Sequence, residues 1–327
     1  MEVGLMVTAF GDVDLADVAV RAEERAYDAV WVGELWGASG VVQAAEIAGR
    51  TESIDVGTAI LNVYSRSPAV LAMTAASMQQ ASDGRFTLGL GTSTPKAVED
   101  LHGMAFDRPV RRAHETIEIV QELTAGTGEP VEYDGELLSV ADFPAIDAEF
   151  PIYHAGLGPA NRRVVGRLCD GWIPHNIPFS ELDDAFEVVA EAARERDRDP
   201  DEIAIAPYVP AAVSDDSDDA RAVLRKHVAY YVGSGEGYRR AVGMRYPDAA
   251  DRVAEAWRDG EKGAAAEAVT DEMVDDLGVA GTPDDAREQL RTLVSETGVD
   301  HPIVVIPAPA SDDLARRTID ELAPDRR

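Results

Sequence analysis

Short apolar runs alternate with amphipathic stretches along most of the chain, and each apolar run is four to eight residues long. Runs of this length that are rich in β-branched residues are typical of parallel strands buried on both faces. The pattern predicts strands at residues 2–8, 29–32, 54–61, 86–90, 151–154, 171–174, 203–209 and 302–306. The stretches between them have helical periodicity, so the chain is predicted to alternate strand and helix.

The segment from residue 54 to residue 101 shows the repeating unit most clearly. After the strand at 54–61, Ser67 supplies a helix N-cap and Pro68 the first helical position, and the helix ends near Gly84. The next strand, 86–90, closes on Gly89 and Gly91. Two parallel strands joined by one helix form a βαβ unit, which binds ligands at the carboxyl edge of its strands.

Eight such strands predict one (β/α)8 TIM barrel that forms a single domain over residues 1–327. The alternative is a doubly wound open sheet, which is disfavoured because no G-x-G-x-x-G turn follows the first strand. Residues 132–136 predict a turn between two short extended pieces.

About ninety residues separate the seventh and eighth predicted strands, which is more than one barrel helix needs. Their helical periodicity predicts a helical insertion between strands 7 and 8, over about residues 212–280, at the carboxyl face of the barrel. There it would shape the substrate pocket. An outer packing layer or a subunit interface explains the same pattern equally well.

Charge is the unusual feature of the composition. The chain has 61 acidic and 30 basic residues, a formal net charge of −31, and its only lysines are Lys96, Lys226 and Lys262. Such a chain repels nucleic acid and anionic membranes, so we expect neither as a partner. Scarce lysine and dispersed acid favour a high-salt cytoplasm over an ordinary acidic cytosolic enzyme. At molar salt the Debye length is about 3 Å, which screens the self-repulsion.

Other features bound the location and the partners. Cys169 is the only cysteine, which excludes an intramolecular disulfide, and no apolar stretch approaches 18 residues. The N-terminus enters a strand without a basic leader. We therefore expect a soluble, cytoplasmic protein. We further expect a homo-oligomer, a dimer or a tetramer, that acts on a small-molecule substrate.

The active site of a barrel forms at the carboxyl ends of its strands. The residues there show no metal-ligand spacing, because His154 and His175 lie on different strands 21 residues apart, so no metal site is predicted. No serine or cysteine nucleophile stands beside a matched base. Glycine, threonine and asparagine dominate instead, which suits a large phosphate-bearing cofactor that performs the chemistry itself.

The turn Gly156-Leu157-Gly158-Pro159 is the best candidate for holding phosphate. Proline suits the first turn of the helix that follows, the glycines allow close approach, and a helix N-terminus attracts anions. A plain tight βα turn is the alternative. Glu34 is the leading acid/base candidate, since partial burial at the barrel mouth would raise its pKa, although a solvated rim carboxylate explains it too. His175 could share that role or be structural.

The amino-acid sequence resembles the luciferase-like flavin and deazaflavin oxidoreductases, and within them the coenzyme F420-dependent methylenetetrahydromethanopterin reductases. The resemblance covers nearly the whole chain in order. The matching residues are Gly57, Asn62, Tyr64, Arg66-Ser67-Pro68, Asp83-Gly84-Arg85, Leu88-Gly89-Leu90-Gly91, Pro151-Ile152-Tyr153, Gly156-Leu157-Gly158-Pro159, Asp170-Gly171-Trp172 and Gly281-Thr282-Pro283-Asp284.

The resemblance implies coenzyme F420 as the cofactor and a bacterial-luciferase-like barrel. Ala59-Ile60 occupies the place of a non-proline cis peptide that supports the deazaflavin ring. It further implies that Asn62 contacts the ring edge, that Gly91, Thr92 and Ser93 lie along the cofactor, and that the glycine turn binds its phosphate-bearing tail.

The implied reaction is hydride transfer between F420 and a pterin-linked one-carbon group, on methylene-tetrahydromethanopterin or methylene-tetrahydrofolate. Leu35 stands where relatives often carry histidine and Met6 where the reductases carry an acid, so the substrate and the proton relay can differ. The alternatives are an FMN-dependent luciferase-like monooxygenase and a non-catalytic flavin- or deazaflavin-binding barrel.

Overall fold

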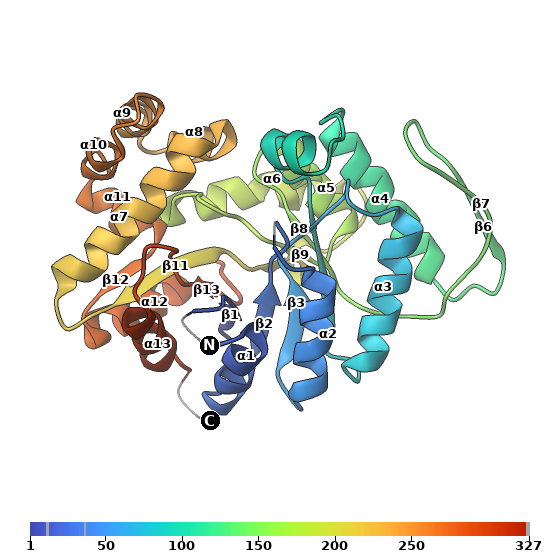
Figure 1. Ribbon diagram of the computed structural model, residues 1–327. Coiled ribbons are helices and arrows are strands. Elements are labelled where there is room, and N and C mark those ends of the chain that lie inside the picture. Colours follow the sequence, from blue (N-terminus) through green and yellow to red (C-terminus); the bar gives the residue numbers. More distant parts are fainter. Residues whose placement is uncertain (11–12, 36, 325–327) are drawn as a thin grey trace.

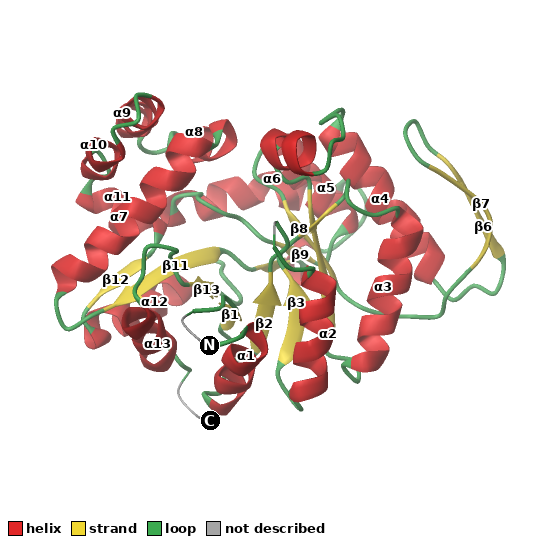
Figure 2. Ribbon diagram, viewed as in Figure 1, coloured by secondary structure: helices red, strands yellow, loops and turns green. Residues whose placement is uncertain are grey.

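Parallel strands form a curled sheet that is surrounded by helices (Figure 1, Figure 2). The computed structural model describes residues 1–10, 13–35 and 37–324. Neighbouring strands in the sheet follow the order β10-β9-β8-β5-β3-β2-β1-β13-β11-β12, and β4 pairs with β5. The strands are β1 Gly4–Met6, β2 Ala29–Val32, β3 Asp55–Thr58, β4 Leu61–Asn62, β5 Phe86–Gly91, β8 Ile152–Ala155, β9 Gly171–Trp172, β10 Ala204–Ile205, β11 Tyr208–Val213, β12 Val279–Gly281 and β13 Ile303–Val305.

The extended segment from β10 to β11 closes the barrel. β10 pairs with β9 while β11 pairs with β13, and only Ala206 and Pro207 separate the two strands. At the junction the Tyr208 N–H donates to the Pro174 carbonyl at 2.9 Å, and the Ile303 N–H donates to the Pro207 carbonyl at 2.8 Å. The predicted seventh strand, 203–209, is thus divided into two strands, β10 and the start of β11, which pair with different neighbours. The predicted TIM barrel is confirmed.

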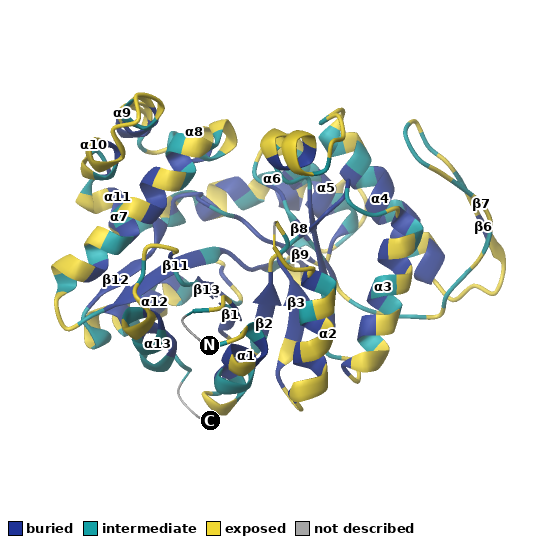
Figure 3. Cartoon of the chain, in the orientation of Figure 1, coloured by how far each residue is buried: buried dark blue, intermediate teal, exposed yellow. Residues whose placement is uncertain are grey.

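The helices that cover the barrel begin where local sequence predicts. The Ser67 side chain accepts from the Val70 N–H at the start of α3, and Asp14 accepts from the Asp17 N–H at the start of α1. Figure 3 shows the strands of the barrel largely buried and the outer faces of the helices exposed. The helices around the barrel are α1 Leu15–Glu24, α2 Gly40–Arg50, α3 Pro68–Ala81, α4 Pro109–Thr124, α5 Pro159–Leu168, α6 Leu182–Arg194, α12 Pro283–Glu296 and α13 Asp312–Glu321, with shorter turns at Ala97–Leu101, Phe179–Glu181 and Pro200–Glu202.

Aromatic rings stack in the barrel interior, those of Trp31, Tyr153 and His301, and glycines on neighbouring strands leave room for the first two. Trp31 and Tyr153 lie with ring centroids 5.6 Å apart. A Cβ at Gly57 would lie 2.4 Å from the Trp31 ring, and one at Gly171 would lie 2.5 Å from the Tyr153 ring. The interior is therefore a packed core, so a ligand must bind at the rim of the barrel.

The insertion between the last two barrel positions is helical, as predicted, but its bounds are narrower. Strand β11 runs on to Val213, and β12 pairs with it in parallel, so residues 212–213 and 279–280 belong to strands rather than to the insertion. The sequence pattern missed β12 because three residues after a helix give no periodicity. The insertion packs around a core of its own and comprises α7 Ser217–Ser234, α8 Glu236–Val242, α9 Pro247–Arg258, α10 Lys262–Glu267 and α11 Asp271–Leu277.

An antiparallel hairpin, β6 Pro130–Asp134 and β7 Ser139–Pro144, stands beside α4 at the edge of the molecule (Figure 1). Its turn lies at residues 135–138, slightly later than predicted, because the buried Glu115 carboxylate accepts from the N–H groups of residues 136–138. No helix in the described part of the chain is long and apolar enough to cross a membrane.

Candidate active site

A β-bulge separates β3 from β4 and carries two of the predicted cofactor-binding residues, Ala59 and Ile60. Gly57 pairs with Thr87 and Leu61 pairs with Leu90, so three residues (58–60) face two (88–89). The one extra residue interrupts the ladder with β5. The Ala59–Ile60 peptide bond is cis, as the family resemblance implies.

Side chains replace the missing ladder contacts at this bulge. The Thr58 hydroxyl lies 2.9 Å from both the carbonyl and the N–H of Gly89. A Cβ at Gly89 would lie 1.7 Å from the Thr58 carbonyl oxygen, so only glycine fits there. From the other side of the barrel, the Tyr208 hydroxyl donates to the Ala59 carbonyl oxygen.

Residues at the end of β5 lie next to the bulge. A Cβ at Gly91 would lie 2.9 Å from the Ile60 side chain, so these two predicted residues are brought together. Thr92 and Ser93 follow directly and are half-buried, with Ser93 in the left-handed region at φ 58°. Their contact with a cofactor stays a prediction.

Asn62 is buried, and the hydrogen bonds of its side chain are made to nearby residues. Its amide oxygen accepts from the N–H groups of Tyr64 and Ser65, at 3.0 and 2.8 Å. Its Nδ2 lies 3.2 Å from Nε2 of His102. The side chain therefore shapes the turn after β4, and the predicted contact with a ring edge stays a prediction.

The turn Gly156-Leu157-Gly158-Pro159 leads from β8 into α5 as predicted. Gly158 is the N-cap residue of α5 and Pro159 its first residue, and no side chain caps the helix N-terminus. A Cβ at Gly158 would meet no atom within 4 Å. The Gly156 carbonyl accepts from the Trp172 indole N–H at 2.7 Å, which holds the turn against β9.

Arg162, in the first turns of α5, is a candidate site residue that the sequence pattern did not reveal. Its side chain is buried, with 5% of the residue exposed, and it forms no ion pair with the described residues. Its Nε has no hydrogen-bond partner, and Nη2 lies 3.8 Å from the sulfur of Met244. Burial lowers the pKa of Arg162. The Arg162 guanidinium carbon lies 5.7 Å from the centroid of the Trp172 ring, which compensates only part of the cost of burial. A buried cation without an ion-pair partner is costly, so a bound anion would stabilise this place.

Glu34 is partly buried, as the sequence predicts, but its carboxylate is paired with Arg66. Its two oxygens accept from Arg66 at 2.5 and 2.8 Å, and Oε2 also accepts from the Gly40 N–H at 2.8 Å, at the start of α2. Burial alone would raise the pKa of Glu34, but the hydrogen bonds from Arg66 and Gly40 outweigh it and lower the pKa. The predicted rise is therefore wrong, since the sequence did not reveal that Arg66 would face Glu34.

His175, just after β9, lies in a cluster of aromatic side chains beneath the insertion. Its ring meets the rings of Tyr208, Tyr231 and Tyr238 edge-on, at centroid distances of 4.8, 4.4 and 5.2 Å. His227 of α7 lies 6.5 Å away. Nε2 is buried and unpartnered in both histidines. Burial and the neighbouring His227 hold the pKa of His175 well below its usual range, so both rings are neutral near pH 7.

The insertion reaches the predicted phosphate turn as well. A Cβ at Gly237 of α8 would lie 3.2 Å from the Leu157 side chain. This contact agrees with the predicted location of the insertion at the carboxyl face.

His154 is fixed inside the protein between the Leu90 carbonyl and Asn161, at 3.1 and 3.3 Å.

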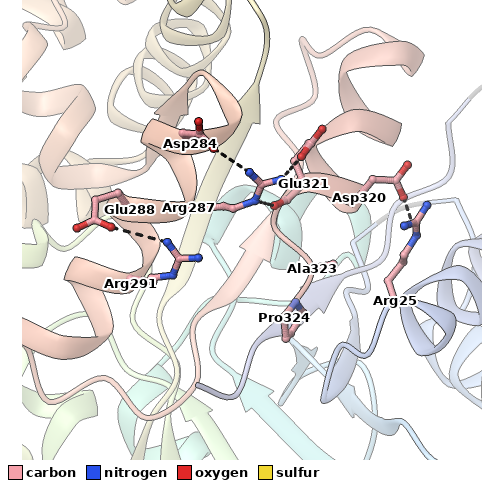
Figure 4. A pocket seen from close by; sticks show the side chains of 9 residues that line it. All are labelled: Arg25, Asp284, Arg287, Glu288, Arg291, Asp320, Glu321, Ala323 and Pro324. Carbon is pink, nitrogen blue, oxygen red and sulfur yellow. Dashed lines mark hydrogen bonds and ion pairs between the residues drawn. The ribbon is translucent and has the colours of Figure 1, made fainter. Parts of the chain in front are cut away.

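A surface hollow of about 720 Å³ lies elsewhere, against α1, α12 and α13 (Figure 4). Arg25 directly follows α1 and precedes β2, so this hollow lies where the strands begin, away from their carboxyl ends. Its arginines are paired with acids: Arg25 with Asp320 at 3.1 Å, and Arg287 with Asp284 at 3.2 Å. Arg162, by contrast, has an Nε without a hydrogen-bond partner. No group of three metal-ligating side chains occurs in the described part of the chain.

Comparison with known proteins places this geometry in a family. The model of the family described as luciferase-like monooxygenase matches residues 10–301. A Mycobacterium tuberculosis protein, provisionally described as a coenzyme F420-dependent oxidoreductase, is 30% identical over 89% of this chain and 91% of its own. The 5,10-methylenetetrahydromethanopterin reductase of Archaeoglobus fulgidus is 30% identical over 85% of each chain.

A solved structure agrees in fold along the whole chain. The coenzyme F420-dependent tetrahydromethanopterin reductase of Methanopyrus kandleri superimposes with a TM-score of 0.81 at 25% identity, covering 99% of this chain and 98% of that one. The chain therefore belongs to the luciferase-like family.

Proposed function

We propose that this protein is a coenzyme F420-dependent oxidoreductase whose α5 turn, together with Arg162, binds the phosphate-bearing part of the cofactor. Arg162 carries the proposal, because it is a buried arginine without an acidic partner in a chain of 61 acidic residues. It lies beside an uncapped helix N-terminus, whose dipole also favours an anion. The F420-dependent relatives give independent support.

The residues of the bulge would hold the ring end of the cofactor. Ile60 lies against Gly91, and Ala59 is fixed by hydrogen bonds, so this surface is ordered without a ligand. When bound, F420 supplies an obligate two-electron hydride carrier. The protein then has to position the ring and the substrate, exclude water and deliver a proton.

The substrate we propose is a pterin-linked one-carbon group, methylene-tetrahydromethanopterin or methylene-tetrahydrofolate. The reductase relatives support this choice. The neutral rings of His175 and Tyr231 also suit a planar uncharged group better than a charged one. The test is oxidation of reduced F420, followed by absorbance, on adding either methylene compound.

Parallel titrations of F420 and FMN test the cofactor assignment. We expect F420 to bind in the micromolar range or tighter and FMN more weakly. Binding of FMN with no binding of F420 would favour the luciferase-like monooxygenase alternative. Binding of F420 without turnover on either methylene compound would support the cofactor assignment and contradict the proposed substrate.

Arg162→Gln tests the anion site, with Arg163→Gln as the matched control. Arg163 is the next residue of the same helix, but its side chain is 41% exposed and pairs with Glu195 at 3.3 Å. A hydrogen bond to a charged group contributes roughly 1.5–3 kcal/mol, so Arg162→Gln should weaken F420 binding about 10- to 100-fold. Arg163→Gln should leave it unchanged.

The unliganded protein supplies a second measurement. Because Arg162 is buried without a counter-ion, Arg162→Gln should leave the free energy of unfolding without ligand unchanged or increase it. Clear destabilisation together with unaltered F420 affinity would mean that Arg162 is a packing residue.

A further inference from the structure

Tyr208 stands at the point where the barrel closes, and the sequence pattern gave no reason to single it out. Its N–H donates to the Pro174 carbonyl at 2.9 Å, and the residue pairs with Ile303 of β13. Its backbone is thus held by strands on both sides. From this fixed position the side-chain hydroxyl reaches across the barrel to the Ala59 carbonyl oxygen, 149 residues away in sequence.

The Ala59 carbonyl belongs to the bulge, where the ladder with β5 is interrupted. The Ala59 N–H still donates to the Val32 carbonyl at 2.8 Å, on the side of β2. Its carbonyl has no ladder partner on β5, since pairing stops at Gly57 and resumes at Leu61. The Tyr208 hydroxyl satisfies this buried acceptor, which a native structure rarely leaves unpaired.

The ring of Tyr208 is held in turn by the cluster around His175. The two rings are 4.8 Å apart and meet edge-on, and His175 contacts Tyr231 of α7 and Tyr238 of α8 on its other sides. Burial, and then the nearby Tyr231 and Tyr238, raise the pKa of Tyr208 well above its usual range. The hydroxyl therefore keeps its proton near pH 7 and can donate to the Ala59 carbonyl oxygen.

We propose that Tyr208 is a positioning residue, which fixes the Ala59 carbonyl and thereby the surface on which the cofactor ring is placed. The proposal rests on the proposed function, because it takes the bulge as the ring-binding surface. Tyr208 acts through the backbone of residues 59–60 and has no proton-transfer role. Misplacement of a reacting group by about 1 Å can cost about 100-fold in rate. Loss of one hydrogen bond at this point can therefore lower the rate strongly.

Tyr208→Phe removes the hydroxyl and keeps the ring. Tyr238→Phe is the matched control, because it removes a hydroxyl from the same cluster, whereas the hydroxyl that reaches the Ala59 carbonyl is that of Tyr208. The first measurement is amide hydrogen exchange of residues 57–62 in the unliganded proteins. We expect faster exchange in Tyr208→Phe and wild-type exchange in Tyr238→Phe.

Measurements with F420 complete the test. In Tyr208→Phe the affinity for F420 should stay within about threefold of wild type, because the α5 turn holds the phosphate-bearing end. The absorption band of bound F420 should shift relative to wild type, and kcat should fall about tenfold or more. Tyr238→Phe should match wild type in all three.

Two results would overturn the proposal: wild-type exchange, spectrum and kcat in Tyr208→Phe, or the same changes in both variants. The second result would assign the effect to packing of the cluster. If wild-type protein does not bind F420, the proposed function fails. Hydrogen exchange of the unliganded proteins then still decides whether Tyr208 fixes residues 57–62.

Discussion

Removing the charge of Glu34 should destabilise the fold and have little effect on chemistry. In Glu34→Gln, Arg66 loses a bidentate carboxylate partner, and the Gly40 N–H loses a charged acceptor. Breaking a fully buried ion pair from one side costs about 3–5 kcal/mol. The Glu34 side chain is 12% exposed and the Arg66 side chain 18%, so water can partly solvate Arg66. We therefore expect a loss of about 2–3 kcal/mol in the free energy of unfolding.

A double-mutant cycle in urea measures this coupling. The variants are Glu34→Gln, Arg66→Met and the pair together, unfolded at one salt concentration at which all are folded. The double variant should be more stable than the sum of the single losses predicts, because neither charge is then left without a partner. The free energy of unfolding should also depend on pH in the direction that the pKa of Glu34 implies. The lowered pKa of Glu34 means that its stabilisation is present above the ordinary pKa of about 4.5 and is lost as pH falls through the folded value.

Kinetics separate this role from general acid catalysis. A general acid contributes about 100- to 10,000-fold, whereas a structural ion pair should leave kcat of the folded, F420-saturated enzyme within about threefold. Unchanged stability in Glu34→Gln, with kcat reduced more than tenfold, would refute our reasoning and restore Glu34 as the acid.

Two further predictions concern pH and salt. Burial lowers the pKa of His227 from 6.5 to about 4, so folding favours the neutral ring and its stabilisation is lost as pH falls from about 6.5 towards 4. Between pH 7.5 and pH 4.5 this loss should be about 2–3 kcal/mol, and His227→Gln should abolish that part of the acid sensitivity in urea unfolding; an identical pH dependence in the variant would contradict it. With a net charge of −31, the melting temperature should rise from dilute buffer to molar potassium chloride, and a flat or falling temperature would reject adaptation to high salt.

Local chemistry explains the parts of the fold that the sequence predicts well. Ser67 with Pro68, and Gly158 with Pro159, begin helices where expected, because capping depends on a few adjacent residues. The apolar runs predict the barrel strands for the same reason, since buried strands need continuous apolar sequence. Strand β12 was missed because it is only three residues long and follows directly after a helix.

Long-range pairing explains what the sequence could not predict at the site. Glu34 and Arg66 lie 32 residues apart, and Tyr208 and Ala59 lie 149 apart, so no local pattern links them. Arg162 differs from its neighbour Arg163 only in what surrounds it, because one is buried and the other pairs with Glu195. A turn can therefore be read from sequence, whereas the protonation state of a side chain requires its spatial neighbours.

Charge at the candidate site is arranged against the charge of the whole molecule. The chain carries −31, yet the bulge, the α5 turn and the His175 cluster contain no carboxylate, and Glu34 is neutralised by Arg66. Buried, unpaired Arg162 then supplies the local positive charge for an anionic ligand. At molar salt the Debye length is about 3 Å, so the long-range repulsion from the acidic surface is screened. A buried pair is screened much less, and the attraction of Arg162 for a phosphate group would persist. The salt that we expect to stabilise the fold would therefore also lower the cost of bringing an anionic cofactor to the barrel.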